Sequence, residues 1–145
     1  MTTAATPIVR QAGCVAIGGR GILIEGAPGT GKSSLALTLV DRGAELVSDD
    51  GVLLVAENGR VIARPHPRTR GLMEVRNLGV LTFPFRNEAP VALAIALDPE
   101  APRYIEEPDT TEIAGLAVPL VRIWPDAHPP AIKVELALRQ YGLQF

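Results

Sequence analysis

The residues with the clearest chemical meaning form an eight-residue loop that matches G-x-x-x-x-G-K-[ST]: Gly26-Ala27-Pro28-Gly29-Thr30-Gly31-Lys32-Ser33. Glycines in such a loop let backbone N–H groups turn inward around phosphate oxygens. A helix that begins at the loop directs its partial positive end at the same anion. Lys32 is expected to neutralise phosphate charge, and Ser33 to bind Mg²⁺. We therefore predict that residues 26–34, ending with Ser34, bind ATP with Mg²⁺.

Two adjacent carboxylates, Asp49 and Asp50, end a short apolar segment about one helix and one turn after this loop. A strand end at that distance is expected to emerge beside the phosphate loop. Carboxylates there can hold Mg²⁺ or accept a proton from an attacking hydroxyl. Neighbouring residues of a strand point to opposite sides, so the two aspartates are expected to have different tasks. The structural alternative is an acidic turn before Gly51.

Glu74 is a charged residue inside the otherwise apolar stretch 71–79. Its spacing alone leaves two interpretations open, a member of the site or a carboxylate on a solvated face paired with Arg76.

The elements that must position these residues are short strands and few helices, because 14 glycines and 13 prolines punctuate the chain. Apolar runs at 14–17 and 21–24 flank a Gly-rich turn and predict a hairpin leading into the loop. Residues 34–42, followed by Gly43, predict a helix with a glycine cap. Further strands are expected at 45–48, 52–56, 61–63, 71–75, 79–83, 91–97 and 118–124, an exposed acidic segment at 104–111, and a closing helix at 131–141. We predict one strand-rich α/β domain over residues 1–145, with residues 1–8 flexible.

Composition narrows the class of protein. The single cysteine, Cys14, excludes an intramolecular disulfide and a cysteine-only metal site. No apolar run approaches the roughly 20 residues that span a bilayer, and the start does not resemble a signal peptide, so we expect a cytoplasmic protein without membrane attachment. A net charge of −2 without a basic block disfavours nucleic acid as the main partner. Small size and apolar content favour a homo-oligomer.

Three spaced blocks of the sequence together resemble one known family. They are the phosphate loop with its preceding hairpin, residues 46–50 (Leu-Val-Ser-Asp-Asp) and residues 74–79 (Glu-Val-Arg-Asn-Leu-Gly). These blocks are similar to the catalytic, C-terminal domain of HPr kinase/phosphorylase, over about residues 9–138. The resemblance is closest to the short bacterial form that lacks the N-terminal domain. It implies a P-loop fold like the core of phosphoenolpyruvate carboxykinase, with a strand-rich mixed sheet, a phosphate-loop helix and a C-terminal helix.

The function that this resemblance implies is an ATP- and Mg²⁺-dependent protein kinase acting on a serine of an HPr-like phosphocarrier of a phosphotransferase system. Many members of the family also reverse the reaction by phosphorolysis. The site residues carried over by motif are the catalytic Asp50, Lys32, Asp49 and Arg103 and the metal ligands Ser33, Glu74 and Asp49. Asp50 takes the proton of the acceptor serine in this assignment, and Asp49 supports the metal site.

Three departures from the family pattern limit what is carried over. Gln11 stands where the family usually has a histidine, and glutamine cannot titrate. Asn77 replaces a glycine after Glu74, which is expected to change the backbone path there. Residues 119–125 are a reduced form of a segment linked to phosphorolysis. We therefore predict kinase activity with weak phosphorolysis.

Two alternatives remain open. One is an ATP-binding regulator without transfer activity, which Gln11 and Asn77 favour. The other is a small-molecule kinase, which would need an arginine-bearing lid over the phosphates. Only Arg64, Arg68 and Arg70 cluster around one loop.

Overall fold

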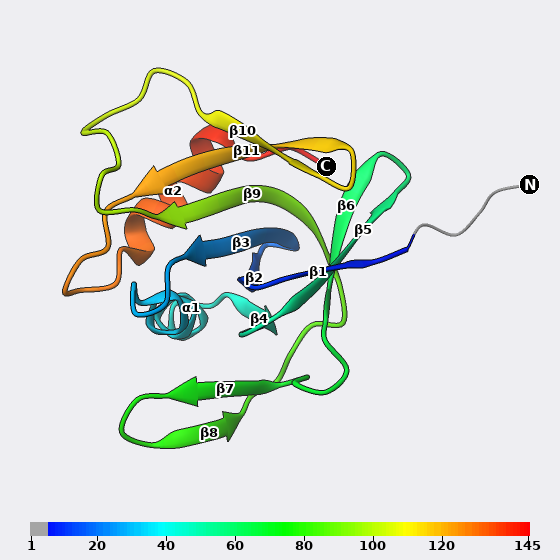
Figure 1. The fold of residues 1–145 in the computed structure, drawn as a ribbon, viewed down its shortest axis with the longest axis vertical. Coiled ribbons are helices and arrows are strands. Elements are labelled where there is room, and N and C mark those ends of the chain that lie inside the picture. The colour runs from blue at the N-terminus through cyan, green and yellow to red at the C-terminus, as the bar shows by residue number, and fades with distance from the viewer. Residues whose placement is uncertain (1–5) are drawn as a thin grey trace, which may run out of the picture.

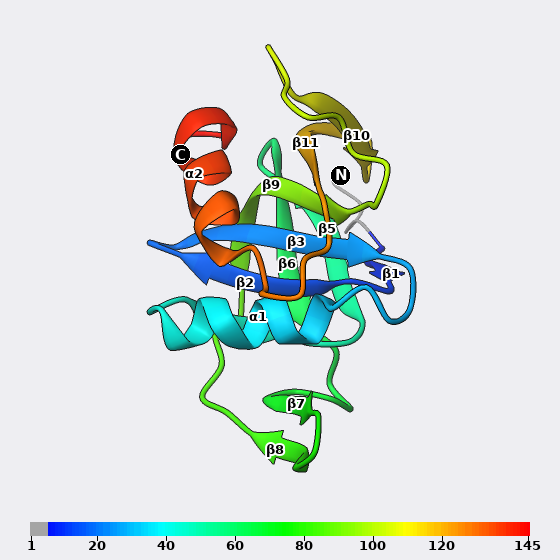
Figure 2. The same ribbon diagram turned by 90° about the vertical axis from the view of Figure 1, so that its left-hand side faces the viewer.

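Strand pairing in the computed structural model, which describes residues 6–145, produces a nine-stranded mixed sheet, a separate two-stranded sheet and two helices (Figures 1 and 2). The elements are β1 (Ile8–Arg10), β2 (Gly13–Ile17), β3 (Arg20–Gly26), α1 (Lys32–Asp41), β4 (Glu45–Ser48), β5 (Val52–Glu57), β6 (Arg60–Pro65), β7 (Leu72–Val75), β8 (Gly79–Thr82), β9 (Ala89–Leu97), β10 (Asp109–Ile113), β11 (Leu116–Ile123) and α2 (Ala131–Tyr141). This architecture confirms the predicted α/β class. Of the segment predicted to be flexible, residues 1–5 lie outside the described residues, and Ile8 already belongs to β1.

The strand directions bring several loops to one end of the large sheet. β9 pairs in parallel with β3 on one side and with β11 on the other, so these three strands end at the same edge (Figure 1). β2 is antiparallel to both β3 and β4, which gives β4 the direction of β3. The phosphate loop after β3 and the aspartate pair after β4 therefore emerge at the same end, as predicted.

Two clusters of buried side chains cover opposite faces of this sheet. Side chains alternate along β3, so Ile22 and Ile24 join the first cluster and Leu23 the second. The first cluster packs α1 and α2 against the sheet, through Leu39 and Val134 among others. The second is closed by β5 and β6, which cross steeply relative to β9 (Figure 1). Both helices therefore lie on one face, and α1 is held rigidly under the loop that precedes it.

Helix α1 begins two residues earlier than predicted, at Lys32, because Gly31 already accepts the first helical hydrogen bond. Its other end follows the prediction. Gly43 has a φ of 110°, and the Ala44 N–H donates to the Leu39 carbonyl at 2.9 Å. This arrangement is the glycine cap expected from the sequence.

The β7–β8 hairpin forms its own sheet on the far side of α1 from the main sheet (Figures 1 and 2). Met73 is 1% exposed and belongs to the cluster around α1. Its neighbours Leu72 and Glu74 point to the opposite face of the hairpin. Asn77 in the turn has a φ of 72°, in the left-handed region that glycine favours and asparagine tolerates. An asparagine where the family pattern has glycine is therefore compatible with the positive φ of this turn.

Two strands, β1 and β10, were not predicted from the sequence, whereas the burial of Cys14 was. β1 and β10 were missed because both are edge strands with little buried surface. β10 also overlaps the end of the segment predicted to be merely exposed, and only its Ile113 is buried. Cys14 is a fully buried core residue, as predicted, and burial raises the pKa of its thiol to about 12. Neither helix among the described residues has the length and apolar character needed to cross a membrane.

Candidate active site

The phosphate loop is held by close contacts and by its own hydrogen bonds. A Cβ at Gly26 would lie 2.6 Å from the Thr30 Oγ1 and 3.2 Å from the Leu97 carbonyl oxygen, so only glycine fits there. The Thr30 hydroxyl donates to the Ala27 carbonyl at 2.7 Å. Lys32 Nζ donates to the Gly26 carbonyl at 3.0 Å, which holds the ammonium group across the loop.

The start of α1 is suited to an anion. Gly31, with a φ of 97°, is its N-cap and provides no side-chain cap, and the first turn carries no acidic residue. The first N–H groups of a helix have no partner within the helix. Their partial positive charge therefore faces the loop without a competing carboxylate on the helix itself.

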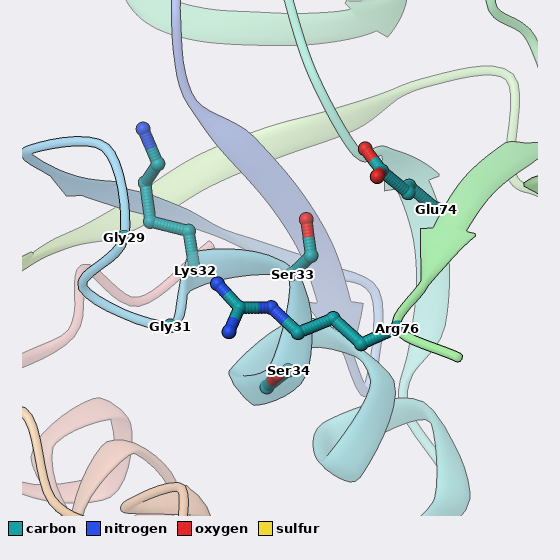
Figure 3. Close-up of a pocket in the computed structure, with 7 residues that line it drawn as sticks. All are labelled: Gly29, Gly31, Lys32, Ser33, Ser34, Glu74 and Arg76. Atoms are coloured by element: carbon teal, nitrogen blue, oxygen red, sulfur yellow. The ribbon is translucent and has the colours of Figure 1, made fainter. Parts of the chain in front are cut away.

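A cavity opens directly above this helix start, and we refer to it as the phosphate cavity (Figure 3). Its lining residues are Gly29, Gly31, Lys32, Ser33, Ser34, Glu74 and Arg76. The Glu74 carboxylate points into the cavity on the side of the Ser33 hydroxyl, and the Arg76 side chain extends across the first turn of α1 (Figure 3). The hairpin β7–β8 therefore supplies one acidic and one basic group to the phosphate loop.

Asp49 connects the phosphate loop, the aspartate pair and the hairpin. Its Oδ1 accepts a hydrogen bond from the Ser33 hydroxyl at 2.9 Å, and its Oδ2 accepts one from the Glu74 N–H at 3.3 Å. Asp49 is only 9% exposed. Burial raises the pKa of this carboxyl above its usual value, an effect that the two hydrogen bonds oppose and that the nearby Asp50 and Glu74 carboxylates reinforce.

This raised pKa leads to a prediction about stability. A carboxyl whose pKa is higher in the folded state favours folding below the ordinary aspartate pKa, and that contribution is lost as the pH rises through the folded-state pKa. Ionisation of Asp49 is therefore less favourable in the folded protein than in the unfolded chain, and it costs stability. We expect Asp49→Asn to raise the melting temperature of the nucleotide-free protein at about pH 7, by about 2–4 °C per kcal/mol relieved. Thermal melts between about pH 4 and 7 check this, and a lower melting temperature for the variant at neutral pH would contradict it.

A second cavity lies on the other side of Ser33, and we refer to it as the aspartate cavity. Its lining residues are Ala12, Lys32, Ser33, Asp49, Asp50, Thr69, Leu72, Glu74 and Val80. Asp50 is exposed and Asp49 is buried, but both line this one cavity. Both also follow the last residue of β4, so the strand alternation on which the prediction rested does not apply to them. Thr69 Oγ1 is buried without a hydrogen-bond partner among the described residues, and an occupant of this cavity could supply one. The two cavities share Lys32, Ser33 and Glu74.

The oxygen atoms around Ser33 fit Mg²⁺. Residues 6–145 contain no group of three His, Cys, Asp and Glu side chains that could hold a metal by themselves. Mg²⁺ bound with a nucleotide, however, is usually held by one or two carboxylates, phosphate oxygens and water. Ser33, Asp49 and Glu74 provide such a set of hard oxygen donors next to the phosphate cavity.

Some expected residues lie elsewhere, and some lining residues were missed. Arg103 is exposed in the loop between β9 and β10 and lines neither cavity, so its assignment rests on the family resemblance alone. The ion pair between Glu74 and Arg76 that was considered from the sequence is absent among the described residues. Arg76 itself was not predicted to be part of the site. The available signal was its position two residues after Glu74, close to the same face of the hairpin.

The phosphate loop at the end of a parallel strand, the helix after it and the adjacent carboxylates define a domain of the P-loop class. The family described as HPr Serine kinase C-terminal domain matches residues 3–125. The chain belongs to this family, which confirms the resemblance drawn from the three sequence blocks.

Named relatives agree with this assignment. The HPr kinase/phosphorylase of Lactobacillus acidophilus is 34% identical over 122 residues, which cover 75% of this chain and 38% of that protein. That of Clostridium beijerinckii is 46% identical over 67 residues, 46% of this chain and 22% of that protein. The structure of the Hpr(Ser) kinase/phosphatase from Coxiella burnetii superposes with a TM-score of 0.82 at 27% identity, covering 91% of this chain and 88% of that one. The matched region spans between 22% and 38% of the length of these two curated relatives.

Proposed function

We propose that this chain transfers the γ-phosphoryl group of ATP to a serine hydroxyl of an HPr-like phosphocarrier protein of a phosphotransferase system. The observation that carries the proposal is the pair of cavities that meet at Lys32, Ser33 and Glu74. One is lined by the phosphate loop and suits the donor nucleotide. The other is lined by Asp50 and suits the acceptor. The names of the relatives, HPr kinase/phosphorylase and Hpr(Ser) kinase/phosphatase, support a serine of HPr as the acceptor. We place the reaction in the cytoplasm as part of the same proposal.

In this proposal Asp50, Lys32 and Asp49 each have a separate task in the reaction. In the transfer, the serine oxygen bonds to the γ-phosphorus while the bond from that phosphorus to the β–γ bridging oxygen breaks, and ADP leaves. Asp50 accepts the serine proton from its side of the site. Lys32 and the N–H groups at the start of α1 balance the negative charge of the transferring group. Asp49 orients the Ser33 hydroxyl through its 2.9 Å hydrogen bond.

A magnesium ion bound with the nucleotide would reduce the charge on its β- and γ-phosphates, held by Ser33, Asp49 and Glu74. We expect Glu74→Gln to raise the Mg²⁺ concentration needed for half-maximal transfer by about tenfold or more, because a neutral amide is a poorer ligand than a carboxylate. A Mg²⁺ titration of the transfer rate measures this effect. Glu112→Gln, an exposed change on β10, is the matched control. An unchanged half-maximal concentration in the Glu74 variant would remove it from the metal site.

The direct test of the proposal is incubation of the protein with Mg²⁺, labelled ATP and a set of HPr-like carriers, followed by mapping of the label. We expect phosphoserine on at least one carrier. Tight ATP binding without transfer to any carrier would instead assign the chain as a nucleotide-binding regulator. Label on a small molecule alone would assign it as a small-molecule kinase.

The reverse reaction, attack of inorganic phosphate on the phosphoserine, is expected to be weak. Arg122, in the segment that the resemblance relates to phosphorolysis, is paired with Asp109 and lies 3.9 Å from an Asp98 carboxylate oxygen, and it lines neither cavity. The carrier in its phosphoserine form is incubated with inorganic phosphate and the protein, and the pyrophosphate released with the free serine is measured. Self-association, expected from size and composition, is checked by the mass of the protein in solution.

A further inference from the structure

Three cavities meet at Arg76, and this meeting point places the residue relative to a bound nucleotide. Besides the phosphate cavity, Arg76 lines a cavity with Leu37, Val75 and Pro129 and another with Thr30, Asp126 and Pro130. Ser34 lines all three as well. Arg76 therefore lies where the phosphate cavity continues away from the aspartate cavity.

The side chain is free to bind an anion there. Some of the other arginines are paired with carboxylates, such as Arg42 with Glu135 at 2.8 Å, but Arg76, like several exposed arginines away from the cavity, takes part in none of the ion pairs formed by residues 6–145. Its guanidinium extends across the first turn of α1 (Figure 3). A guanidinium group in this position matches the geometry of phosphate oxygens, to which it can donate two parallel hydrogen bonds.

The position of the Arg76 backbone is set by the structure around it. Met73, three residues earlier, is buried in the cluster that includes α1, and the Glu74 N–H is bonded to Asp49. The Leu78 N–H donates to the Val75 carbonyl at 3.0 Å, which closes the turn that carries Arg76. The backbone of Arg76 is thus tied to both the helix and the aspartate pair.

Lys32 and Arg76 both line the phosphate cavity, but they border different cavities next to it. The aspartate cavity contains Lys32 and not Arg76, whereas the two cavities near Pro129 contain Arg76 and not Lys32. The γ-phosphate must face the acceptor beside Asp50, so the nucleoside end of the nucleotide must extend toward Pro129.

We propose that Arg76 binds the α- and β-phosphates of the nucleotide, on the side of the phosphate cavity away from Asp50, and that the nucleoside lies beyond it toward Pro129. This inference rests on the proposed function, because it takes the nucleotide to be the phosphoryl donor. In this proposal Arg76 is the arginine that contacts the nucleotide. Arg103, which the family resemblance suggested, lines neither the phosphate cavity nor the aspartate cavity.

The test is calorimetric titration of ATP and of ADP, each with Mg²⁺, into the wild-type chain, Arg76→Ala and Arg76→Lys. We expect Arg76→Ala to weaken both nucleotides by a similar factor of about 10 or more, the loss of a hydrogen bond to a charged group. Arg76→Lys should recover part of the affinity, because lysine keeps the positive charge but cannot donate two parallel hydrogen bonds from one planar group. Arg139→Ala, at the end of α2, is the charge-matched control and should bind as the wild type does.

The outcomes separate this inference from the proposed function. Affinities of Arg76→Ala within about twofold of wild type would overturn the inference and leave the kinase proposal standing. If Arg76→Ala bound ATP more weakly but ADP with the wild-type affinity, the placement of Arg76 at the α- and β-phosphates would be overturned. Weakening of both nucleotides, in a protein that transfers phosphate to no carrier, would support the inference and overturn the kinase proposal. A wild-type chain that binds neither nucleotide would overturn both.

Discussion

Replacing Asp50 with asparagine is expected to reduce kcat/KM for phosphoryl transfer by about 10²–10⁴, the usual contribution of a positioned general base. Asparagine has nearly the same shape, so the aspartate cavity should keep its form. Its amide cannot accept the serine proton as a carboxylate does. Steady-state kinetics with a phosphocarrier measure the loss, and calorimetry should find ATP bound with the same affinity as in the wild type.

Asp41→Asn is the matched control for this variant. It makes the same chemical change at an exposed position at the end of α1, away from both cavities. We expect its transfer rate to equal that of the wild type. If Asp50→Asn retained at least a third of the wild-type kcat/KM, Asp50 would not be the base. Asp50 would then be only part of an acidic turn before Gly51, the structural alternative that the sequence also allowed.

Replacing Lys32 with alanine is expected to lower kcat by about 10²–10³, the effect of removing one charged group that stabilises the transferring phosphoryl. The lysine is already positioned, since its Nζ donates to the Gly26 carbonyl at 3.0 Å across the loop. Alanine removes the only lysine that lines either cavity. Rapid-quench measurement of a single turnover isolates this loss from product release.

Lys133→Ala is the control for the charge change, because Lys133 is an exposed lysine on α2. Lys32→Arg tests the geometry, since it keeps the charge on a longer, planar group. We expect Lys133→Ala to leave turnover unchanged and Lys32→Arg to remain strongly impaired. Full turnover in Lys32→Ala would argue against phosphoryl transfer at this loop.

Local features of the fold were predictable because their causes are local. The hairpin before the loop follows from a Gly-rich turn between two apolar runs, and the cap of α1 follows from Gly43. The closing helix at 131–141 begins and ends as predicted. The edge strand β10 was not predictable in this way, because its residues are mostly polar and its pairing with β11 provides most of its order.

The candidate site shows the same division between local and distant causes. The phosphate loop and the aspartate pair are recognisable from residue type and spacing alone. The burial of Asp49 and its hydrogen bond to Ser33 were not, because they depend on how β4 and α1 are placed by the sheet. Nor could spacing alone decide whether Glu74 faced Ser33 or paired with Arg76.

The sequence by itself thus determined the phosphate loop, the expectation of ATP with Mg²⁺ and the family. These depend on backbone conformations and residue types within a few positions of one another. Only the tertiary structure decided which distant groups join the loop. It packs Met73 of the β7–β8 hairpin against the cluster around α1, which brings Glu74 and Arg76 to the helix start and leaves Arg103 outside. The physical reason is that burial of an apolar face fixes the hairpin, and the polar groups on it are carried along.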